Sequence, residues 1–267
     1  MKTFRYWVRH ECQLIIDGTG TKVVFIGGSD VSEQDAKHTA LKKAEAVQRK
    51  INGDKKQFEE YEVEIREEQI ERINTSAVIT RNRYGAHVLN VENQMILDVD
   101  DPPRSSLFDL FQKKTEDWKL DRLAGAVEKL SRKLNDSLIG FRIYKTCKGF
   151  RVIVTGREML PGDRMARLIS KSLNVDELYW FLCKRQNCYR ARLTPKPHRI
   201  KYKAIRIRLA DSLDRREEIL SWEKGYLEKS RNYSVCKYIK TVGNDMRNSL
   251  ISLHDHYTGA LTNKKLA

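Results

Sequence analysis

Residues 141–156, FRIYKTCKGFRVIVTG, contain the stretch that decides the fold. Two apolar runs, Ile139–Tyr144 and Phe150–Val154, flank Lys145-Thr146-Cys147-Lys148-Gly149, a short polar segment that ends in glycine. Runs of this length, rich in β-branched and aromatic residues and separated by a glycine-containing turn, predict two antiparallel strands. A hairpin at the centre of the chain favours a mixed or antiparallel sheet over a doubly wound parallel one.

The chain before this hairpin predicts a second hairpin followed by a helix. Residues 13–16 and 22–26 flank Asp17-Gly18-Thr19-Gly20, a typical turn sequence. Ser32, with Asp35 three residues later, predicts the N-cap of a helix that Asn52-Gly53 ends. We also expect a helix over residues 65–73, short strands over residues 77–80 and 86–90, and a strand over residues 95–99.

The chain after residue 100 is dominated by helical patterns. Residues 118–134 place their apolar side chains on one face of a helix, and shorter helices are expected over residues 163–173 and 176–184. The last 55 residues read as mostly helical. The prediction is therefore an α+β fold with a mixed or antiparallel central sheet, flanking helices and a helical C-terminal extension. Its expected parts are an N-terminal α+β subregion, a core and the extension, over residues 1–90, 91–211 and 212–267.

The distribution of charge points to an anionic partner. The chain has 267 residues, with 51 Lys and Arg against 36 Asp and Glu, a formal net charge of +15. Residues 184–208, KRQNCYRARLTPKPHRIKYKAIRIR, contain ten of these cations and no acid. Such a density, interleaved with Tyr189 and Tyr202, is typical of surfaces that bind phosphates, although a solvated basic face is the alternative.

Other compositional features exclude several classes of protein. The apolar runs are too short for a transmembrane helix, so no membrane partner is expected. The five cysteines form no C-x-x-C pair, which predicts neither a disulfide framework nor a zinc site. The expectation is a basic, soluble, cytoplasmic protein.

Two carboxylates end the strand predicted over residues 95–99. In QMILDVDDPP, residues 94–103, Asp98 and Asp100 are one residue apart and lie on the same side of the strand. Paired carboxylates repel each other unless a cation lies between them, and oxygen ligands of this kind hold Mg²⁺ or Mn²⁺. Asp98→Asn is therefore expected to leave the metal-free protein no less stable. The alternative is that the acids are simple turn chemistry before Pro102.

The turn of the central hairpin offers cations for a phosphate. Gly149 allows a close approach of the backbone, and three nearby cations are candidates for contacting a triphosphate: Lys145, Lys148 and Arg151. An ordinary hairpin with polar outward residues is the alternative. No G-x-x-x-x-G-K-[ST] or G-x-G-x-x-G sequence is present, which excludes a P-loop nucleoside triphosphatase and a Rossmann site.

The order of these parts resembles the catalytic core of the archaeo-eukaryotic primase superfamily. In that family a strand ending in D-x-D is followed by a hairpin with a glycine turn, a further acid, and a motif similar to R-x-x-P-x-S-x-H-x-K. This chain has the D-x-D at Asp98 and Asp100, KTCKGFR at residues 145–151, an acid at Asp176, and RLTPKPHRIK at residues 192–201. The resemblance spans roughly residues 94–202.

The resemblance implies a metal-dependent nucleotidyltransferase of the primase-polymerase type. Asp98, Asp100 and Asp176 would hold Mg²⁺ or Mn²⁺ and align a nucleoside triphosphate with a 3′-hydroxyl on single-stranded DNA or RNA. The implied nucleotide and nucleic-acid contacts are Lys145, Lys148, Arg151, Arg190, Arg192, His198 and Lys201. The family hairpin carries histidine where this chain has Arg151, which supports an inactive nucleic-acid-binding module of the same fold as the alternative.

Other functions are less well supported by the residues. A scaffold that recruits partners through the helical C-terminus stays open, and a D-x-D glycosyltransferase would leave the basic run unexplained. His254-Asp255-His256 is interpreted as a surface cluster on a helix, because alternate helical residues point to different sides. A haloacid-dehalogenase-like site is disfavoured, because Pro102 stands where threonine or valine should follow Asp100.

Overall fold

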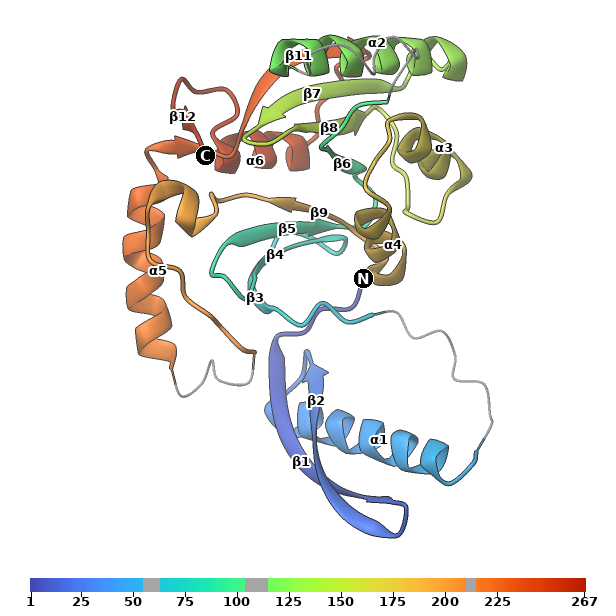
Figure 1. Cartoon of the computed structure of the whole chain (residues 1–267), viewed down its shortest axis with the longest axis vertical. Helices are drawn as coiled ribbons and strands as arrows, with labels where there is room; N and C mark the ends of the chain where they lie inside the picture. The colour runs from blue at the N-terminus through green and yellow to red at the C-terminus, as the bar shows by residue number, and fades with distance from the viewer. Residues whose placement is uncertain (55–62, 104–114, 210–214) are drawn as a thin grey trace.

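The computed structural model describes residues 1–54, 63–103, 115–209 and 215–267. In these ranges helices and strands alternate, and both four-stranded sheets are antiparallel, which confirms the α+β prediction. The described strands form two four-stranded sheets in place of the single central sheet expected, together with a two-stranded hairpin that hangs below them in Figure 1 and a short parallel pair near the C-terminus.

The first sheet has the strand order β11-β7-β8-β6, and its strands are Cys236–Gly243, Gly140–Thr146, Phe150–Thr155 and Ile96–Val99. The predicted central hairpin forms β7 and β8, and β8 lies between β6 and β7. The helix α2, Glu116–Leu134, connects β6 to β7, so the three strands and the helix make a split β-α-β unit.

Helices cover both faces of this sheet. Figure 1 shows α2 on one face and α6, Ser249–Thr258, on the other. The predicted amphipathic stripe of α2 is buried, including Leu123, Val127 and Leu130, and Thr115 caps the helix by accepting a hydrogen bond from the Trp118 amide. Because side chains alternate across a strand, every second residue of β7 and β8 faces α6.

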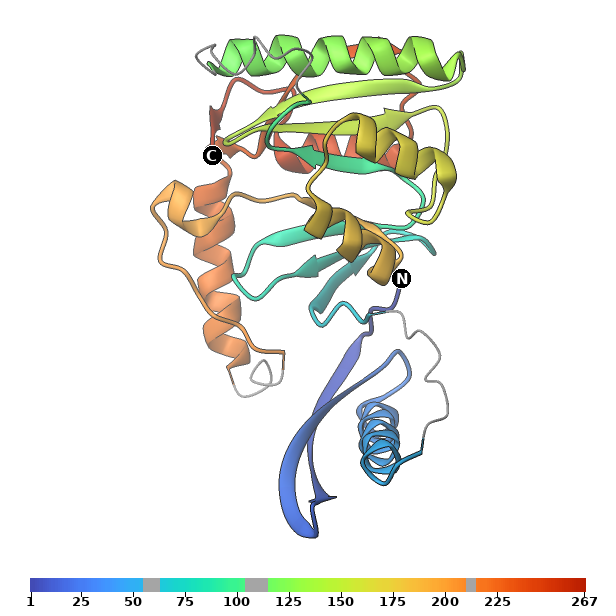
Figure 2. The same ribbon diagram turned by 45° about the vertical axis from the view of Figure 1, so that its right-hand side comes forward.

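The second sheet has the order β3-β4-β5-β9, and its strands are Glu68–Arg72, Ala77–Arg81, His87–Val91 and Tyr189–Arg192. Two short helices, α3 (Arg164–Ser172) and α4 (Glu177–Gln186), precede β9. After β9 the chain makes one 3₁₀ turn, η2 (Pro197–Ile200). The longer helix α5, Arg216–Ser230, then stands beside this second sheet, as Figure 2 shows.

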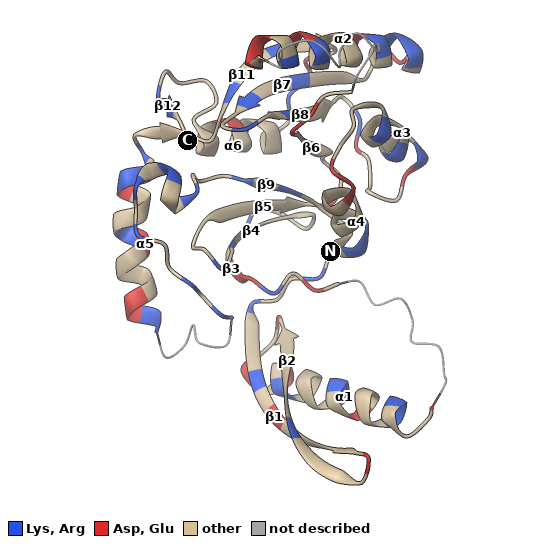
Figure 3. Cartoon of the chain, viewed as in Figure 1, with Lys and Arg blue, Asp and Glu red and all other residues tan. Residues whose placement is uncertain are grey.

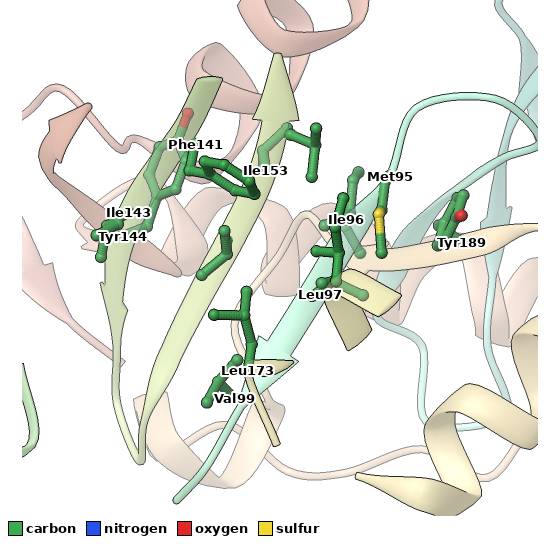
Figure 4. Close-up of a cluster of buried hydrophobic side chains, with 14 of the residues drawn as sticks. Met95, Ile96, Leu97, Val99, Phe141, Ile143, Tyr144, Ile153, Leu173 and Tyr189 are labelled. Atoms are coloured by element: carbon green, nitrogen blue, oxygen red, sulfur yellow. The ribbon is translucent and has the colours of Figure 1, made fainter. Parts of the chain in front are cut away.

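One hydrophobic core joins the two sheets. It includes Ile79 and Leu89 of the second sheet together with Leu97, Phe141 and Ile153 of the first. Figure 4 shows Met95, which directly precedes β6, lying toward Tyr189 of β9. The boundary predicted between residues 90 and 91 therefore falls inside β5, before its last residue, and the side chains of β5 and β6 share this core. The boundary predicted at residues 211 and 212 lies outside the described residues.

The N-terminal unit consists of a long hairpin and one helix. Strands β1 (Tyr6–Ile16) and β2 (Thr19–Ser29) pair in one continuous register, and α1 (Glu33–Ile51) packs on one face of them. Gly27 allows this close packing, because a Cβ there would lie 1.9 Å from the Ala36 carbonyl oxygen. The predicted turn and the Ser32 cap are both confirmed.

Two secondary-structure predictions were wrong. Residues 65–73 contain the edge strand β3 in place of a helix, because pairing with β4 outweighs the local preference of this charged segment. The C-terminal segment is less helical than expected: besides α5 and α6 it contains β11 and the short strands β10 (Tyr233–Ser234) and β12 (Lys265–Leu266). Strand β11 completes the first sheet, so this segment is part of the folded core.

A cation-rich candidate nucleic-acid site

Asp98 does not face a second carboxylate but an arginine on the neighbouring strand. Asp98 of β6 and Arg151 of β8 are register partners, with Arg151 Nε 2.8 Å from Asp98 Oδ1 and a second hydrogen bond of 3.4 Å to Oδ2. The Arg151 side chain is 3% exposed and that of Asp98 44% exposed. Burial acts to lower the pKa of Arg151, but the Asp98 charge and smaller contributions outweigh it and raise that pKa. Arg151 is therefore a permanently charged partner of Asp98.

Arg151 is held from behind by a buried histidine. Its guanidinium donates a hydrogen bond to the Arg192 carbonyl oxygen at 3.2 Å and lies 3.1 Å from His254 Nε2. Burial lowers the pKa of His254, and a guanidinium can only donate. His254 is thus neutral, accepts at Nε2 and donates from Nδ1 to the Asp255 carboxylate at 3.0 Å. The interpretation of residues 254–256 as a surface cluster was wrong for His254 and Asp255, which are buried, and only His256 is exposed.

Asp100 lies against the turn of the central hairpin. A Cβ on Gly149 would lie 2.6 Å from the Val99 carbonyl oxygen and 3.0 Å from Asp100 Oδ1, so the end of β6 and the turn are in close contact. Gly149 thus allows a close approach to β6, and its expected approach to a phosphate stays a prediction. Lys148 is exposed at the same turn, whereas Lys145 is occupied by an ion pair with Glu116 of α2.

Cations of the basic run gather beside these two acids. Burial lowers the pKa of Arg192, and the neighbouring Arg151 charge lowers it further. The pKa of Lys196 is lowered first by burial and then by the charges of Arg192, Arg199 and Lys148, while Asp100 acts in the opposite direction. Lys196 is therefore within electrostatic reach of Lys148 at the hairpin turn and of Asp100. No carboxylate in the described part of the chain forms an ion pair with Arg192, Lys196, Arg199 or Lys148.

The remaining predicted residues have other surroundings. Arg190 forms an ion pair of 2.6 Å with Glu67. His198 and Lys201 are exposed in and just after η2. Asp176 is the N-cap of α4, where its Oδ1 accepts a hydrogen bond of 2.7 Å from the Tyr179 amide. The structure thus brings Asp98, Asp100, Lys148, Arg151 and Arg192 into one neighbourhood and gives Lys145, Asp176 and Arg190 local partners.

This arrangement does not fit a three-carboxylate metal centre. Both oxygens of Asp98 are bonded to Arg151, and Asp176 caps a helix. Among the residues that the structure describes, no three His, Cys, Asp or Glu side chains come together as a metal-ligand group. A Mg²⁺ or Mn²⁺ ion at Asp98 would have to displace the Arg151 guanidinium, so metal binding stays a prediction.

Sequence reasoning missed two members of the cluster, Lys196 and Arg199. Lys196 lies between Pro195 and Pro197, which fix the backbone on both sides of it. A cation held between two prolines inside a basic run is the pattern from which its role could have been inferred. Arg199 follows in the 3₁₀ turn η2, where its position depends on tertiary structure.

Comparison with known proteins gives no match for this chain. No family model matches it, and no curated protein or solved structure is significantly similar to it. Among the described helices none combines the length and the apolar character that crossing a bilayer requires. The resemblance to the primase superfamily therefore rests on the short motifs alone, and the function must be inferred from the geometry above.

Proposed function

We propose that this protein binds single-stranded nucleic acid through four cations around Asp98 and Asp100, defined here as the inner cluster: the exposed Lys148 and the half-buried Arg192, Lys196 and Arg199. The observation that supports this most directly is that Arg192 and Lys196 are both half-buried and that neither has a carboxylate partner in the described residues. Burial and the neighbouring cations accordingly lower the pKa of both side chains. Holding like charges together in partial burial is unfavourable, and a bound phosphate relieves it. An anion is therefore the ligand that this arrangement fits.

A track of exposed cations extends from the inner cluster. After η2 the chain runs extended toward α5, with Ile205 and Ile207 buried against α5 and the side chains of Lys201, Lys203, Arg206 and Arg208 exposed. Figure 3 shows the basic residues recurring along β9 and this segment. Beside the track, Tyr202 packs against Trp222 with ring centroids 5.5 Å apart. A row of cations following a cluster suits a chain of phosphates better than one small anion.

The depth of the cations favours a single strand. Arg192 and Lys196 are partly covered by protein, so a phosphate must enter the site to reach them. A flexible single strand can bend its backbone into such a recess, whereas the phosphates of a duplex lie on a stiff outer surface. Whether the strand is DNA or RNA does not alter this argument, because both present the same phosphates.

A salt titration of oligonucleotide binding tests the proposal. Fluorescence anisotropy with a labelled single strand should give an affinity that falls steeply with salt, and replacing Arg192, Lys196 and Arg199 with Ala should reduce the log–log slope by about 2, at about 0.7 per lost phosphate contact. A matched control replaces the exposed α1 cations Lys37, Lys42 and Arg49 with Ala, which removes the same charge. If the slope falls equally in both variants, or does not fall in the first, the inner cluster is not the binding site.

Nucleotidyl transfer is the second candidate, favoured by the contact between Asp100 and the hairpin turn that carries Lys148. It requires Arg151 to release Asp98 so that Mg²⁺ or Mn²⁺ can bind. A rise in the thermal midpoint with either metal, lost in Asp98→Asn, together with incorporation of labelled nucleotide, would favour the enzyme. Binding of the strand with no metal response and no incorporation would favour the module without turnover.

A further inference from the structure

The outer edge of β1 is an open strand edge. Strands β1 and β2 form a two-stranded sheet of their own, and Figures 1 and 2 show the hairpin standing away from the two larger sheets. At the tip of the hairpin the α1 side chain of Gln48 covers this edge. Its Oε1 accepts from the Ile15 amide at 2.8 Å, and its Nε2 donates to the Ile15 carbonyl oxygen at 3.1 Å. Both main-chain groups of Ile15 therefore point away from β2.

The same orientation recurs at every second residue of β1. In an antiparallel ladder, main-chain groups alternate between the partner strand and the outside, and the β1–β2 register is continuous from Tyr6 to Ile16. The amides and carbonyls of Trp7, Arg9, Glu11 and Gln13 consequently also point outward. Within the described residues nothing outside the hairpin bonds to them. Gln48 thus covers only the last position of a longer open edge.

The side chains of these four residues share the sheet face opposite α1. Leu14, on the other face, is buried against α1, while Arg9, Glu11 and Gln13 are exposed. Glu11 forms one ion pair with Lys22 of β2 at 3.0 Å, and both side chains are more than half exposed, so this pair is weak. The open edge therefore carries a cation and an acid two residues apart, on one face.

We propose that this edge pairs with β1 of a second copy of the chain, antiparallel and centred on His10. In this register Arg9 lies opposite the partner's Glu11 and, by symmetry, Glu11 lies opposite the partner's Arg9. Trp7 lies opposite the partner's Gln13, and each of these facing pairs exchanges two main-chain hydrogen bonds. The two hairpins become one four-stranded sheet with a helix from each copy, and the twofold symmetry covers the open β1 edge of both copies.

The charges select this register and this occupant. Only residues whose main-chain amide and carbonyl point outward can bond across the interface, and these are every second residue. The neighbouring registers are therefore shifted by two residues. One alternative places Arg9 opposite the partner's Arg9, and the other places Glu11 opposite the partner's Glu11. Like charges directly opposite each other are unfavourable across strands, whereas opposite charges are favourable. The charges of this edge are complementary to those of an identical strand that runs antiparallel to it. The edge therefore fits a second copy of the chain better than an unrelated strand.

Charge reversal and restoration test the pairing. Sedimentation or light scattering over a concentration series should show a monomer–dimer equilibrium. Arg9→Glu and Glu11→Arg should each weaken it by about tenfold or more, and the double variant should restore it. Lys37→Glu, on the exposed side of α1, is the control and should leave the equilibrium unchanged. A monomer at every concentration, or a folded double variant that stays as weak as the single ones, overturns the proposal.

Crosslinking tests the register separately. In a Cys12→Ser background, His10→Cys places two thiols opposite each other across the twofold axis, at a spacing that a disulfide can span. This variant should give a disulfide-linked dimer on oxidation, whereas Gln13→Cys should not, because it faces Trp7 of the other copy. Equal crosslinking of both variants would refute the register. These outcomes are independent of nucleic-acid binding, which uses residues of the two larger sheets.

Discussion

The protein contains two pairs of buried or half-buried cations, Arg142 with Arg151 and Arg192 with Lys196, and the surroundings of the two pairs differ. Arg142 and Arg151 of the first sheet are matched with acids: Arg142 contacts Asp245 at 2.6 Å and Asp255 at 2.9 Å, and Arg151 contacts Asp98. Arg192 and Lys196 have lowered pKa values and no ion pair in the described residues. A matched cation contributes to the fold, whereas an unmatched one carries an electrostatic cost that a ligand can relieve.

The largest effect on stability is expected at Arg142. Arg142→Met should lower the free energy of unfolding by about 3–5 kcal/mol, because it leaves the buried Asp255 without its cation. Urea denaturation followed by circular dichroism measures this loss. Arg157→Met is the matched control: it removes the ion pair of the half-exposed Arg157 with Asp136 and should cost less than about 1 kcal/mol. If the two variants lose similar amounts of unfolding free energy, a cation paired with a buried acid contributes no more to stability than a cation at the surface.

A smaller loss is expected at Asp98. Asp98→Asn should destabilise the protein by about 1–2 kcal/mol, less than a fully buried pair because Asp98 is partly exposed to water. This reverses the expectation from the sequence, which had Asp98 repelled by Asp100. Asp100→Asn serves as the control and should change the free energy of unfolding by no more than about 0.5 kcal/mol. If both variants are equally stable, the Asp98–Arg151 pair contributes nothing to the fold.

Lys196 should behave in the opposite way to Arg142. Lys196→Met removes a cation that burial and its neighbours disfavour, so the thermal midpoint should stay the same or rise. Affinity for a single-stranded oligonucleotide should nevertheless fall about tenfold at low salt, because one phosphate contact is lost. Lys37→Met on α1 should change neither quantity. If Lys196→Met loses stability and keeps its affinity for the oligonucleotide, Lys196 contributes to the fold, as Arg142 does, and does not bind a phosphate.

The smallest effect concerns the pH dependence of stability. His254 has a folded-state pKa below the ordinary value of about 6.5, so the unfolded chain binds a proton first as the pH falls. Its contribution is present above about pH 6.5 and is lost as the pH falls from there toward the folded-state pKa, with a slope of at most about 1.4 kcal/mol per pH unit. Urea titrations between pH 5 and 7 should show this slope flattened in His254→Gln. His256→Gln, at an exposed position, should keep it.

Local sequence patterns predicted much of the fold. The hairpins, the Ser32 cap and the stripe of α2 depend on neighbouring residues, and all were confirmed. Strand β3 was missed because Glu68 and Glu71 favour a helix until an adjacent strand is present to pair with them. The pairing of β11 with β7 joins residues about 90 positions apart, and no periodicity in either segment indicates its partner.

The sequence predicted which residues belong to the candidate site better than it predicted what those residues contact. D-x-D and the basic run drew attention to Asp98 and Arg192, which lie in one neighbourhood. The sequence could not show that Arg151 faces Asp98, because that depends on the register between β6 and β8. It also could not show that Asp176 is used as a helix cap, since the same residue type serves as a metal ligand and as an N-cap.

The split β-α-β unit has a consequence for the order in which the protein folds. Strands β7 and β8 are neighbours in the chain, so their hairpin closes a short loop and forms at little entropic cost. Among the described strands β6 pairs with β8 alone, and Asp98 is 53 residues from Arg151. The edge that receives Asp98 therefore exists only after the hairpin is made. Formation of the Asp98–Arg151 pair should be a late event, so weakening it is expected to speed unfolding more than it slows folding.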